Sequence, residues 1–400
     1  MKKLFIIGLG VGHEDFRTKK AADIIRSADK VLSLSRFFKN DPSVEYVDLT
    51  GLMQQLNCPR SAATTTAVLV GGDCCFFSIT RKLVQEFSNL YEIELINGIS
   101  SIQYFSAKIS VPYDDALLIS VHGREERIVS LTAYHRKIFV LTGGKYKAHD
   151  LCRILYENGL TDVKIQIGEK LSGSDEKIVT GTPVTLKERT FDDLSVMYIE
   201  NESARIPSVP IRDDDFIRGH VPMTKEEIRC QSIRKLAIQP KDILYDIGAG
   251  TGSMSVEMAR CAFEGTVYAI EKNDAALELI EQNRIKHGAF NIIVIKTSAP
   301  EYFAELPVPD KAFIGGSSGN IDAIIKALVE MNPKIKIVAN VISLQSLNQI
   351  LNAYSSLGLM ETETICVNIA KSKKIGNYDM MTAQNPVYIV TGTRRESCES

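Results

Sequence analysis

Several features of membrane, zinc and nucleic-acid-binding proteins are missing from this sequence of 400 residues. No stretch approaches the roughly 18 consecutive apolar residues of a membrane span. Eight cysteines are scattered without a C-x-x-C pair or a Cys/His cluster at zinc spacing, so we expect free thiols and no metal site. Lys and Arg number 47 against 49 Asp and Glu, so the basic excess of a nucleic-acid-binding protein is also absent. We therefore expect a cytoplasmic protein with no nucleic-acid and no membrane partner.

The first residues resemble a signal peptide only superficially, because two lysines precede a short apolar run. Gly8, Gly10 and Gly12 interrupt that run, charged residues follow, and no cleavage site with small residues is present. The segment is more typical of a strand followed by a glycine turn.

Short apolar runs alternate with helical patterns along the chain, without an internal repeat or a low-complexity tract. This alternation, in a chain that is 44% hydrophobic and 24% charged, predicts a globular α/β protein with parallel sheets. The expected strands include Leu4–Ile7, Thr66–Val70, Leu117–Val121, Ile138–Leu141 and Val163–Ile167, and the expected helices include Ala21–Ser27 and Ile79–Phe87.

The segment 201–222 is the best candidate for a domain boundary. It holds three prolines and the acidic triplet 213–215, and proline is unsuited to a central strand or helix because it lacks a backbone donor. A helix is expected directly afterwards, with Thr224 as its N-cap and Glu227 completing a capping box. We therefore divide the chain into domains of residues 1–204 and 205–400.

A glycine-rich loop follows a predicted strand in the second domain. The strand runs into Asp246, and Gly248, Gly250 and Gly252 follow before a helix expected from about Ser253. Glycines at such a turn let the backbone approach a ligand because no Cβ intervenes. The dinucleotide fingerprint G-x-G-x-x-G requires glycine at the position of Ser253, so the match to an NAD site is imperfect.

The next predicted strand, Thr266–Ile270, ends in Glu271, which lies 19 residues beyond Gly252. A carboxylate there can accept hydrogen bonds from both ribose hydroxyls of a nucleotide. The loop, helix, strand and carboxylate in this order resemble motif I of class I S-adenosylmethionine-dependent methyltransferases. The alternative is a structural glycine turn with a solvated Glu271. The resemblance implies a Rossmann-like fold with an antiparallel last strand, for which 363–370 and 386–391 are the candidate pair.

Four further segments narrow this resemblance to the decarboxylating C15-methyltransferases of cobalamin biosynthesis, which act on (cobalt-)precorrin-6B. They are 221–229 (VPMTKEEIR), 298–301 (SAPE), 314–321 (IGGSSGNI) and 338–347 (VANVISLQSL), and the similarity spans about 212–392. The resemblance implies a cofactor site for S-adenosylmethionine in this domain. Its residues would be Thr224, Asp246, Gly248, Ala249, Gly250, Thr251, Gly252, Glu271 and Ala299.

The first domain resembles a different family, the tetrapyrrole (corrin/porphyrin) methylases. The resemblance covers about 1–200 and is closest to the C5-methyltransferases of the same pathway. It rests on 8–12 (GLGVG), 69–79 (LVGGDCCFFSI), 97–101 (NGISS), 119–124 (ISVHGR) and 140–144 (VLTGG). It implies a two-lobed α/β fold with a second S-adenosylmethionine between the lobes, so that each domain holds one cofactor. By this resemblance Gly72, Asp73, Ser100 and Ser101 line that cofactor site.

One position in the first cofactor loop departs from the family pattern. Cys74 stands where the family usually has proline after Gly72 and Asp73, and Cys75 adds a second thiol. Losing proline frees φ at this turn. The sequence therefore leaves the conformation of this loop undecided, although Gly72 and Asp73, which are expected to bind the cofactor, are kept.

His122 and Arg124 admit two interpretations. A histidine at a strand end is commonly a core or turn residue, but here it adjoins a guanidinium, which binds carboxylates in a bidentate fork. Precorrins carry many carboxylates, so both residues are candidates for substrate binding. Residues 124–147 hold six basic and two acidic side chains, which form either a solvated face or a docking rim for an anionic macrocycle.

The two resemblances together imply S-adenosylmethionine-dependent methylation of an anionic precorrin at C15, with loss of the C12 acetate as carbon dioxide, and at C5. No Ser/His/Asp triad is visible, and methyl transfer from a sulfonium mainly requires positioning and exclusion of water, so we assign no catalytic residue. Two alternatives remain, an RNA or protein methyltransferase with an inactive tetrapyrrole-binding module and a tetrapyrrole carrier without turnover. The neutral charge balance disfavours the first, and the two intact loops disfavour the second. We expect a homo-oligomer.

Overall fold

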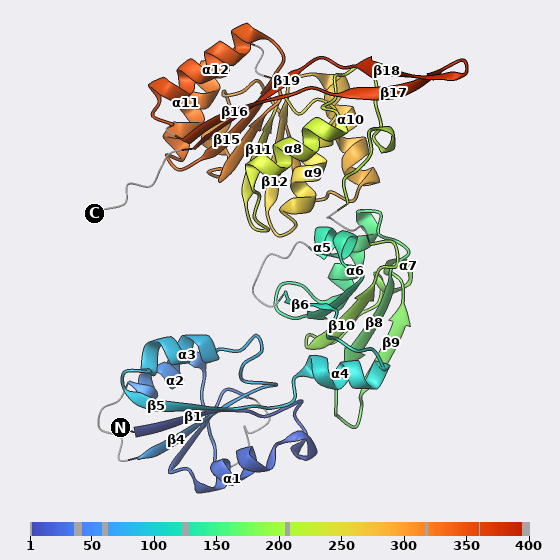
Figure 1. Ribbon diagram of the computed structural model, residues 1–400. Helices are drawn as coiled ribbons and strands as arrows, with labels where there is room; N and C mark the ends of the chain where they lie inside the picture. Colours follow the sequence, from blue (N-terminus) through green and yellow to red (C-terminus); the bar gives the residue numbers. More distant parts are fainter. Residues whose placement is uncertain are drawn as a thin grey trace. The chain divides into compact units, whose positions relative to one another are not determined.

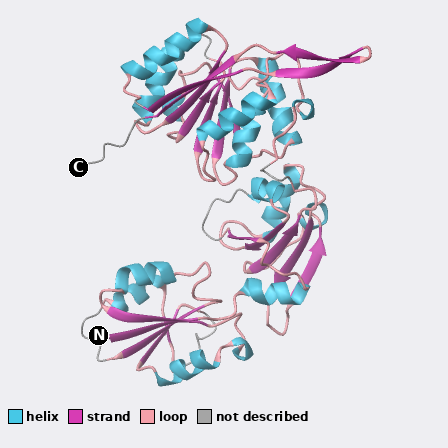
Figure 2. Cartoon of the chain, in the orientation of Figure 1, coloured by secondary structure: helices cyan, strands magenta, loops and turns pink. Residues whose placement is uncertain are grey.

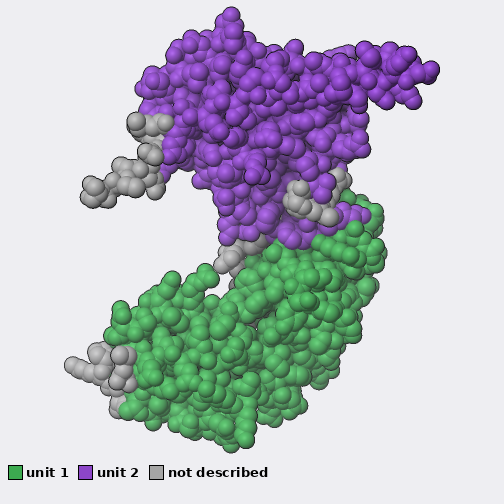
Figure 3. All heavy atoms as spheres, in the orientation of Figure 1, with its two compact units in different colours: residues 1–126, 136–202 green, residues 127–135, 203–400 purple. Residues whose placement is uncertain are grey.

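The computed structural model describes residues 2–35, 42–57, 63–121, 128–204, 209–316, 319–359 and 361–393. The chain forms two compact units, one of residues 1–126 and 136–202 and one of residues 127–135 and 203–400 (Figure 3). Helix α5, Ile128–Tyr134, belongs to the second unit, where the ring of the following His135 lies 5.5 Å from that of Phe263. Among the described helices, none has the length and apolar character that a bilayer crossing requires.

A parallel sheet in the order β3-β2-β4-β1-β5 begins the first unit (Figure 1). Its strands are β1 (Lys2–Gly8), β2 (Lys30–Ser33), β3 (Glu45–Tyr46), β4 (Thr65–Val70) and β5 (Tyr91–Ile96). Helix α1 (Lys19–Ser27) packs on one face, and helices α2 (Leu49–Leu56) and α3 (Thr80–Phe87) pack on the other. The buried residues on both faces explain why these strands read as continuous apolar runs.

A second sheet of the first unit has the order β6-β7-β10-β8-β9. Its strands are β6 (Leu117–Ser120), β7 (Lys137–Leu141), β8 (Lys164–Glu169), β9 (Lys177–Gly181) and β10 (Ser195–Glu200), and its helices are α4 (Ser101–Ile109), α6 (Ala148–Glu157) and α7 (Pro183–Leu186). β6 and β7 are parallel, but the other described pairs are antiparallel. The prediction of parallel sheets is therefore wrong for most of this one, because an apolar run does not encode the direction of its neighbour.

The sheet of the second unit has the order β13-β12-β11-β14-β15-β19-β16. The parallel strands are β11 (Ile243–Ile247), β12 (Thr266–Glu271), β13 (Ile292–Lys296), β14 (Lys311–Ile314) and β15 (Lys336–Val341). β19 (Val387–Thr393) is antiparallel to both β15 and β16 (Glu361–Val367). The predicted antiparallel last strand of a class I methyltransferase fold is thus confirmed.

Helices cover both faces of this sheet, as Figure 2 shows. One core contains apolar residues of α8 (Glu226–Leu236), α9 (Ser253–Cys261) and α10 (Asp274–Lys286). The opposite core contains residues of α11 (Ile321–Met331) and α12 (Leu344–Ser356). With both faces buried, the open edge at the carboxyl ends of the parallel strands is left for a ligand.

A two-stranded hairpin, β17 (Ala370–Ile375) and β18 (Tyr378–Ala383), extends away from this sheet (Figure 1). Its residues are exposed throughout both strands. Lys371 near its base forms an ion pair of 2.6 Å with Glu227 on α8. The sequence interpretation placed β16 and β19 but did not predict this insertion between them.

Candidate active site

A cavity of about 1000 Å³ lies in the second unit at the carboxyl ends of the parallel strands. The segments 247–251, 270–273 and 297–299, which follow β11, β12 and β13, form one part of its wall. Residues 220–225, the ends of β14 and β15, Gln384, Asn385 and Val387 form much of the remainder. Such an edge, where neighbouring parallel strands end, is where open α/β sheets bind their ligands.

The glycine loop after β11 is held tightly against its neighbours. Gly248 and Ala249 donate backbone hydrogen bonds to the carbonyl of Ile270, at 3.0 and 3.3 Å. Gly248 has a φ of +71°, and a Cβ there would lie 2.5 Å from the carbonyl oxygen of Gly316. This position therefore requires glycine, because a side chain would collide with the loop that follows β14.

Glu271, at the end of β12, is fixed by backbone donors on both sides. Its Oε2 accepts from the nitrogen of Gly250 at 2.9 Å, and its Oε1 accepts from Lys272 at 2.8 Å and Asn273 at 3.0 Å. The carboxylate thus faces the cavity with a defined orientation and retains lone pairs for further donors.

Asp246 is fully buried beneath the loop and is not part of the cavity wall. Ser255 on α9 donates to Oδ2, whereas Oδ1 has no partner among the described residues. Burial raises the pKa of this carboxyl to about 7, the charge of Glu271 adds to the effect, and the Ser255 hydrogen bond opposes it. Asp246 is therefore a titratable group inside the fold that supports the loop.

In the first unit, three glycines bring the ends of β1, β4 and β5 into backbone contact. A Cβ on Gly98 would lie 2.5 Å from the carbonyl oxygen of Gly8 and 2.6 Å from that of Gly72. Gly72 also exchanges two backbone hydrogen bonds with Gly10, at 2.9 and 3.0 Å. The GLGVG segment, the loop at 71–74 and the start of the GISS segment are therefore brought together as a single glycine junction.

Asp73 joins these loops through its carboxylate. Oδ1 accepts from the nitrogen of Cys75 at 2.7 Å, and Oδ2 accepts from the nitrogen of Gly98 at 3.1 Å. Ser100 is buried as the N-cap of α4 and forms a complete capping box with Gln103. Ser101, the first residue of that helix, is half-buried. The four residues predicted for this site thus lie at one end of the parallel sheet.

The two thiols of this loop differ in environment. The Sγ of Cys74 is buried, donates to the carbonyl of Ile96 at 3.3 Å and lies 3.8 Å from the Sγ of exposed Cys75. Burial raises the pKa of Cys74 to about 12, and the neighbouring Cys75 and Asp73 add to the effect. Cys74 therefore occupies the family's proline position as a neutral core side chain.

Family models match both halves of the chain. Residues 3–186 match the tetrapyrrole (corrin/porphyrin) methylases, and residues 215–394 match the precorrin methyltransferase domain. A probable cobalt-precorrin-6B C(15)-methyltransferase (decarboxylating) from Pyrobaculum calidifontis is 43% identical over 46% of this chain and 95% of its own length. The chain belongs to the precorrin methyltransferase family.

Two further proteins are similar to different shares of this chain. A precorrin-6Y C(5,15)-methyltransferase [decarboxylating] from Sinorhizobium sp. is 29% identical over 81% of this chain and 78% of its own length. The crystal structure of a precorrin-6y C5,15-methyltransferase from Geobacter metallireducens is 36% identical, with a TM-score of 0.45, over 47% of this chain and 97% of that chain. S-adenosylmethionine is the methyl donor of precorrin methyltransferases.

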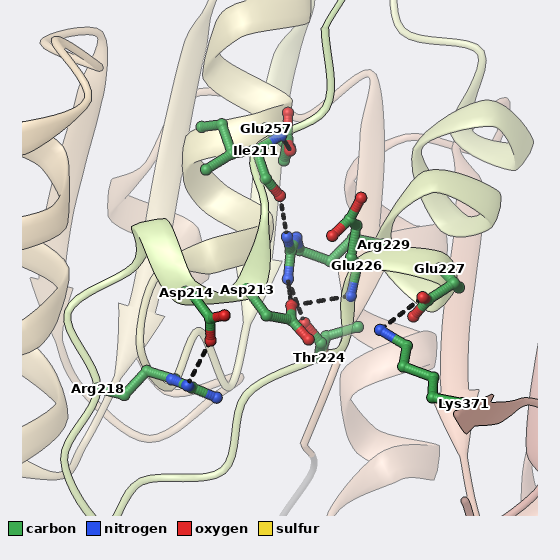
Figure 4. Close-up of polar contacts among 10 residues, drawn as sticks. All are labelled: Ile211, Asp213, Asp214, Arg218, Thr224, Glu226, Glu227, Arg229, Glu257 and Lys371. Atoms are coloured by element: carbon green, nitrogen blue, oxygen red, sulfur yellow. Dashed lines mark hydrogen bonds and ion pairs between the residues drawn. The ribbon is translucent and has the colours of Figure 1, made fainter. Parts of the chain in front are cut away.

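In this precorrin methyltransferase, a buried arginine holds the segment that closes one side of the cavity (Figure 4). The guanidinium of Arg229, only 1% exposed, contacts Asp213 at 2.6 Å and donates to the carbonyls of Thr224, at 2.7 Å, and Ile211. Its Cζ also lies 4.7 Å from the centre of the Phe216 ring. One α8 side chain therefore fixes the segment 211–224 at both of its ends.

The predicted capping box at Thr224 and Glu227 is wrong. Helix α8 begins at Glu226, and its N-cap Lys225 makes no side-chain capping bond. The nitrogen of Glu226 instead donates to Asp213 Oδ1 at 2.9 Å, and Glu227 pairs with the hairpin (Figure 4). An aspartate 13 residues away supplies the cap because its ion pair with Arg229 holds it at this helix end.

The structure brings most of the predicted cofactor residues of the second unit to one cavity. Those that line it are Thr224, Gly248, Ala249, Gly250, Thr251, Glu271 and Ala299. Asp246 and Gly252 lie behind this wall. His122 and Arg124, predicted to contact substrate, lie outside the described residues.

Sequence interpretation missed two residues that hold a wall segment in place and three that line the cavity. Arg229 and Asp213 hold the segment 211–224 and carry no local signal, although the acidic triplet at 213–215 marked the segment as unusual. Asn340, Gln384 and Asn385 line the cavity, from β15 and from the chain between β18 and β19. The segment 338–347 contributed to the family resemblance, but nothing in it distinguished Asn340 from its neighbours.

Proposed function

We propose that the chain catalyses two S-adenosylmethionine-dependent C-methylations of a precorrin in cobalamin biosynthesis. Residues 205–400 would methylate C15 of (cobalt-)precorrin-6B and release the C12 acetate as carbon dioxide, and residues 1–204 would methylate C5 to complete (cobalt-)precorrin-8. The observation that carries the proposal is the cavity of about 1000 Å³ that joins the glycine loop and Glu271 to an uncharged wall at 340–342 and 384–387. A cavity of this size has room for a cofactor and part of a second ligand.

The residues of the second unit fit S-adenosylmethionine. Glu271 offers an oriented carboxylate to ribose hydroxyls, and the glycine loop leaves backbone exposed to the cavity. Asp246 Oδ1 is a buried acceptor without a partner among the described residues, directly below that loop. When bound, the cofactor would supply an electrophilic methyl group. Thr224, Gly248, Ala249, Gly250, Thr251, Glu271 and Ala299 would contact it, and Asp246 and Gly252 would support the loop.

The protein's contribution to this reaction is positioning. The segment 220–224, held down by Arg229, covers the loop and limits the access of water to the reacting methyl group. The macrocycle can itself supply the nucleophilic carbon and accept the electron pair of the departing carboxylate, so no separate acid, base or metal is required.

The proposal includes a second S-adenosylmethionine site, in the first unit. Its support is the glycine junction of Gly8, Gly72 and Gly98. There the parallel strands β1, β4 and β5 end in a backbone surface without side chains, beside the N-terminus of α4. Gly72, Asp73, Ser100 and Ser101 would form this site. His122 and Arg124 remain the proposed contacts of this half with the substrate carboxylates.

We also propose that the chain acts as a homo-oligomer. Ile375, Tyr378, Met380 and Met381 on the β17–β18 hairpin are all more than half exposed, and an isolated two-stranded hairpin is only marginally stable in water. A second copy would cover these side chains. Light scattering on the full chain and on a Tyr378→Asp variant tests this, and a monomer at all concentrations would refute it.

The decisive experiment is mass spectrometry of the product after incubation with S-adenosylmethionine. Precorrin-6B and cobalt-precorrin-6B should be supplied in parallel. The expected product has gained two methyl groups and lost one carbon dioxide for one of these substrates. Unchanged mass with both substrates, with a protein that binds the cofactor, would refute the proposed function.

A further inference from the structure

Asn340 is a polar cavity residue that the cofactor site leaves unused. Its Nδ2 is buried and has no partner among the described residues, and the residue lines the cavity. Buried amides normally satisfy their donors, so an unpaired donor on a residue that lines a ligand cavity needs an explanation.

The position of Asn340 in the sheet separates it from the adenosyl side of the cavity. Ile247 pairs with Ile314, and Ile314 pairs with Ala339, so Gly248, Gly315 and Asn340 follow at the same level of three adjacent strands. Neighbouring strands are about 4.8 Å apart, which places β15 roughly 10 Å from β11 on the side opposite β12 and Glu271. Asn340 therefore belongs to the part of the cavity available to the second ligand.

Helix α8 holds the other end of this amide. The hydroxyl of Ser232, itself fully buried, lies 3.0 Å from Asn340 Oδ1 and 2.9 Å from the carbonyl of Ile228, and it donates toward both. With Oδ1 fixed in this way, the orientation of Nδ2 is set before any ligand arrives. A preoriented donor loses little freedom on binding.

The surroundings of Asn340 differ from the charged parts of the wall. Ile228 and Val341 line the same cavity, and so does Val387, which precedes Tyr388, the β19 partner of Val341. The lysines of the wall, Lys225 and Lys272, belong to the segments 220–225 and 270–273, and Lys272 is exposed. Cations at an exposed rim suit the carboxylates that a precorrin keeps.

We infer that Asn340 Nδ2 binds the substrate carboxylate that leaves as carbon dioxide in the C15 reaction, an inference that rests on the function proposed above. A cation would stabilise that carboxylate and oppose its loss, whereas a neutral amide in an apolar wall orients it with little stabilisation of its charge. The carbon–carboxyl bond breaks, and its electron pair neutralises the iminium that methylation at C15 creates. Charge balances because a methyl cation equivalent enters and a carboxylate departs as neutral carbon dioxide.

The test compares the full-length protein with Asn340→Ala and Asn340→Asp, using the substrate form that the wild type accepts. Loss of the hydrogen bond that orients the carboxylate should lower kcat/KM for C15 methylation with decarboxylation roughly 10- to 100-fold, because a small misplacement of a reacting group costs up to about 100-fold. Carbon dioxide released per methyl at C15 should also fall, and the Kd for S-adenosylmethionine should stay unchanged. Asn340→Asp should be worse than Asn340→Ala, because two carboxylates would then face each other.

Two further variants separate positioning from general stability. Ser232→Ala removes the group that orients Asn340, so it should lower the carbon dioxide to methyl ratio less than Asn340→Ala does. Asn332→Ala is the matched control, because Asn332 Nδ2 donates to the carbonyl of Pro309 outside the cavity wall, and it should leave the ratio and kcat/KM unchanged.

An Asn340→Ala enzyme with wild-type kcat/KM and a wild-type ratio would overturn the inference. A parallel loss of cofactor affinity would also overturn it, by assigning the amide to the cofactor. An inactive wild type would instead refute the proposed function, so the two failures are distinguishable.

Discussion

The backbone nitrogen of Gly250 donates a hydrogen bond of 2.9 Å to Glu271 Oε2, and this contact ties the glycine loop to the end of the next strand. The loop and the carboxylate are therefore a single structural unit, even though 21 residues separate them. A change at either residue should alter the geometry of the other.

Gly250→Asp should abolish S-adenosylmethionine binding to the second unit. A Cβ there would lie 3.1 Å from the carbonyl of Pro222, φ is +57°, and the substitution adds a negative charge to a loop that already binds the Glu271 carboxylate. Calorimetric titration should find two sites on the wild type and one on the variant, and C15 methylation and decarboxylation should be lost together. Gly376→Asp is the control, because Gly376 also has a positive φ, +62°, but open space around it. Two sites in Gly250→Asp would contradict the assignment.

Gly98→Ala should disable the first unit alone. Its Cβ would overlap the carbonyls of Gly8 and Gly72, and relieving such overlap costs about 1–3 kcal/mol and would open the glycine junction. Mass spectrometry should then find a product that is methylated at C15 and decarboxylated but lacks the C5 methyl. Gly159→Ala in the same unit keeps a positive φ but meets nothing within 4 Å, so it should retain both methylations. Equal loss in both variants would argue against the junction as a cofactor site.

Arg229→Gln should destabilise the second unit strongly. It leaves Asp213 partly buried without its cation and releases the carbonyls of Ile211 and Thr224, and breaking a buried pair costs roughly 3–5 kcal/mol. Denaturant unfolding should report this loss, with weaker cofactor binding because Thr224 lines the cavity. Arg218→Gln removes an exposed pair with Asp214 and should cost less than about 1 kcal/mol. Similar losses of unfolding free energy in both variants would show that the buried network stabilises the fold no more than the exposed pair does.

Asp246 should make the second unit less stable as pH rises. Burial raises its pKa to about 7, so the folded state keeps a proton that an unfolded aspartate releases near pH ~3.9. The unfolding free energy therefore falls between these values, by roughly 2–3 kcal/mol from about pH 5 to pH 8, and is constant above the folded pKa. Asp246→Asn should flatten this dependence in denaturant titrations of the cofactor-free protein. Asp322→Asn, on the exposed face of α11, should keep the wild-type slope, and a steep slope in Asp246→Asn would contradict the assignment.

Local sequence determined the strands and loops that position the site. Asp246, the glycines at 248–252 and Glu271 lie in the predicted order because a buried parallel strand, a tight turn and a helix each leave a signal within a few residues. The two segments of the last antiparallel pair could be located in the sequence, but their antiparallel direction was implied by the family resemblance.

Only the tertiary structure decided how distant segments complete that site. Asp213 caps α8 in place of Thr224, and Ser232 orients Asn340 across 108 residues of sequence, because these contacts depend on which elements pack together. The largely antiparallel sheet β6-β7-β10-β8-β9 likewise follows from chain topology, since an apolar run has the same appearance in either direction. Periodicity reports which face of an element is buried, and long-range packing selects the partner that buries it.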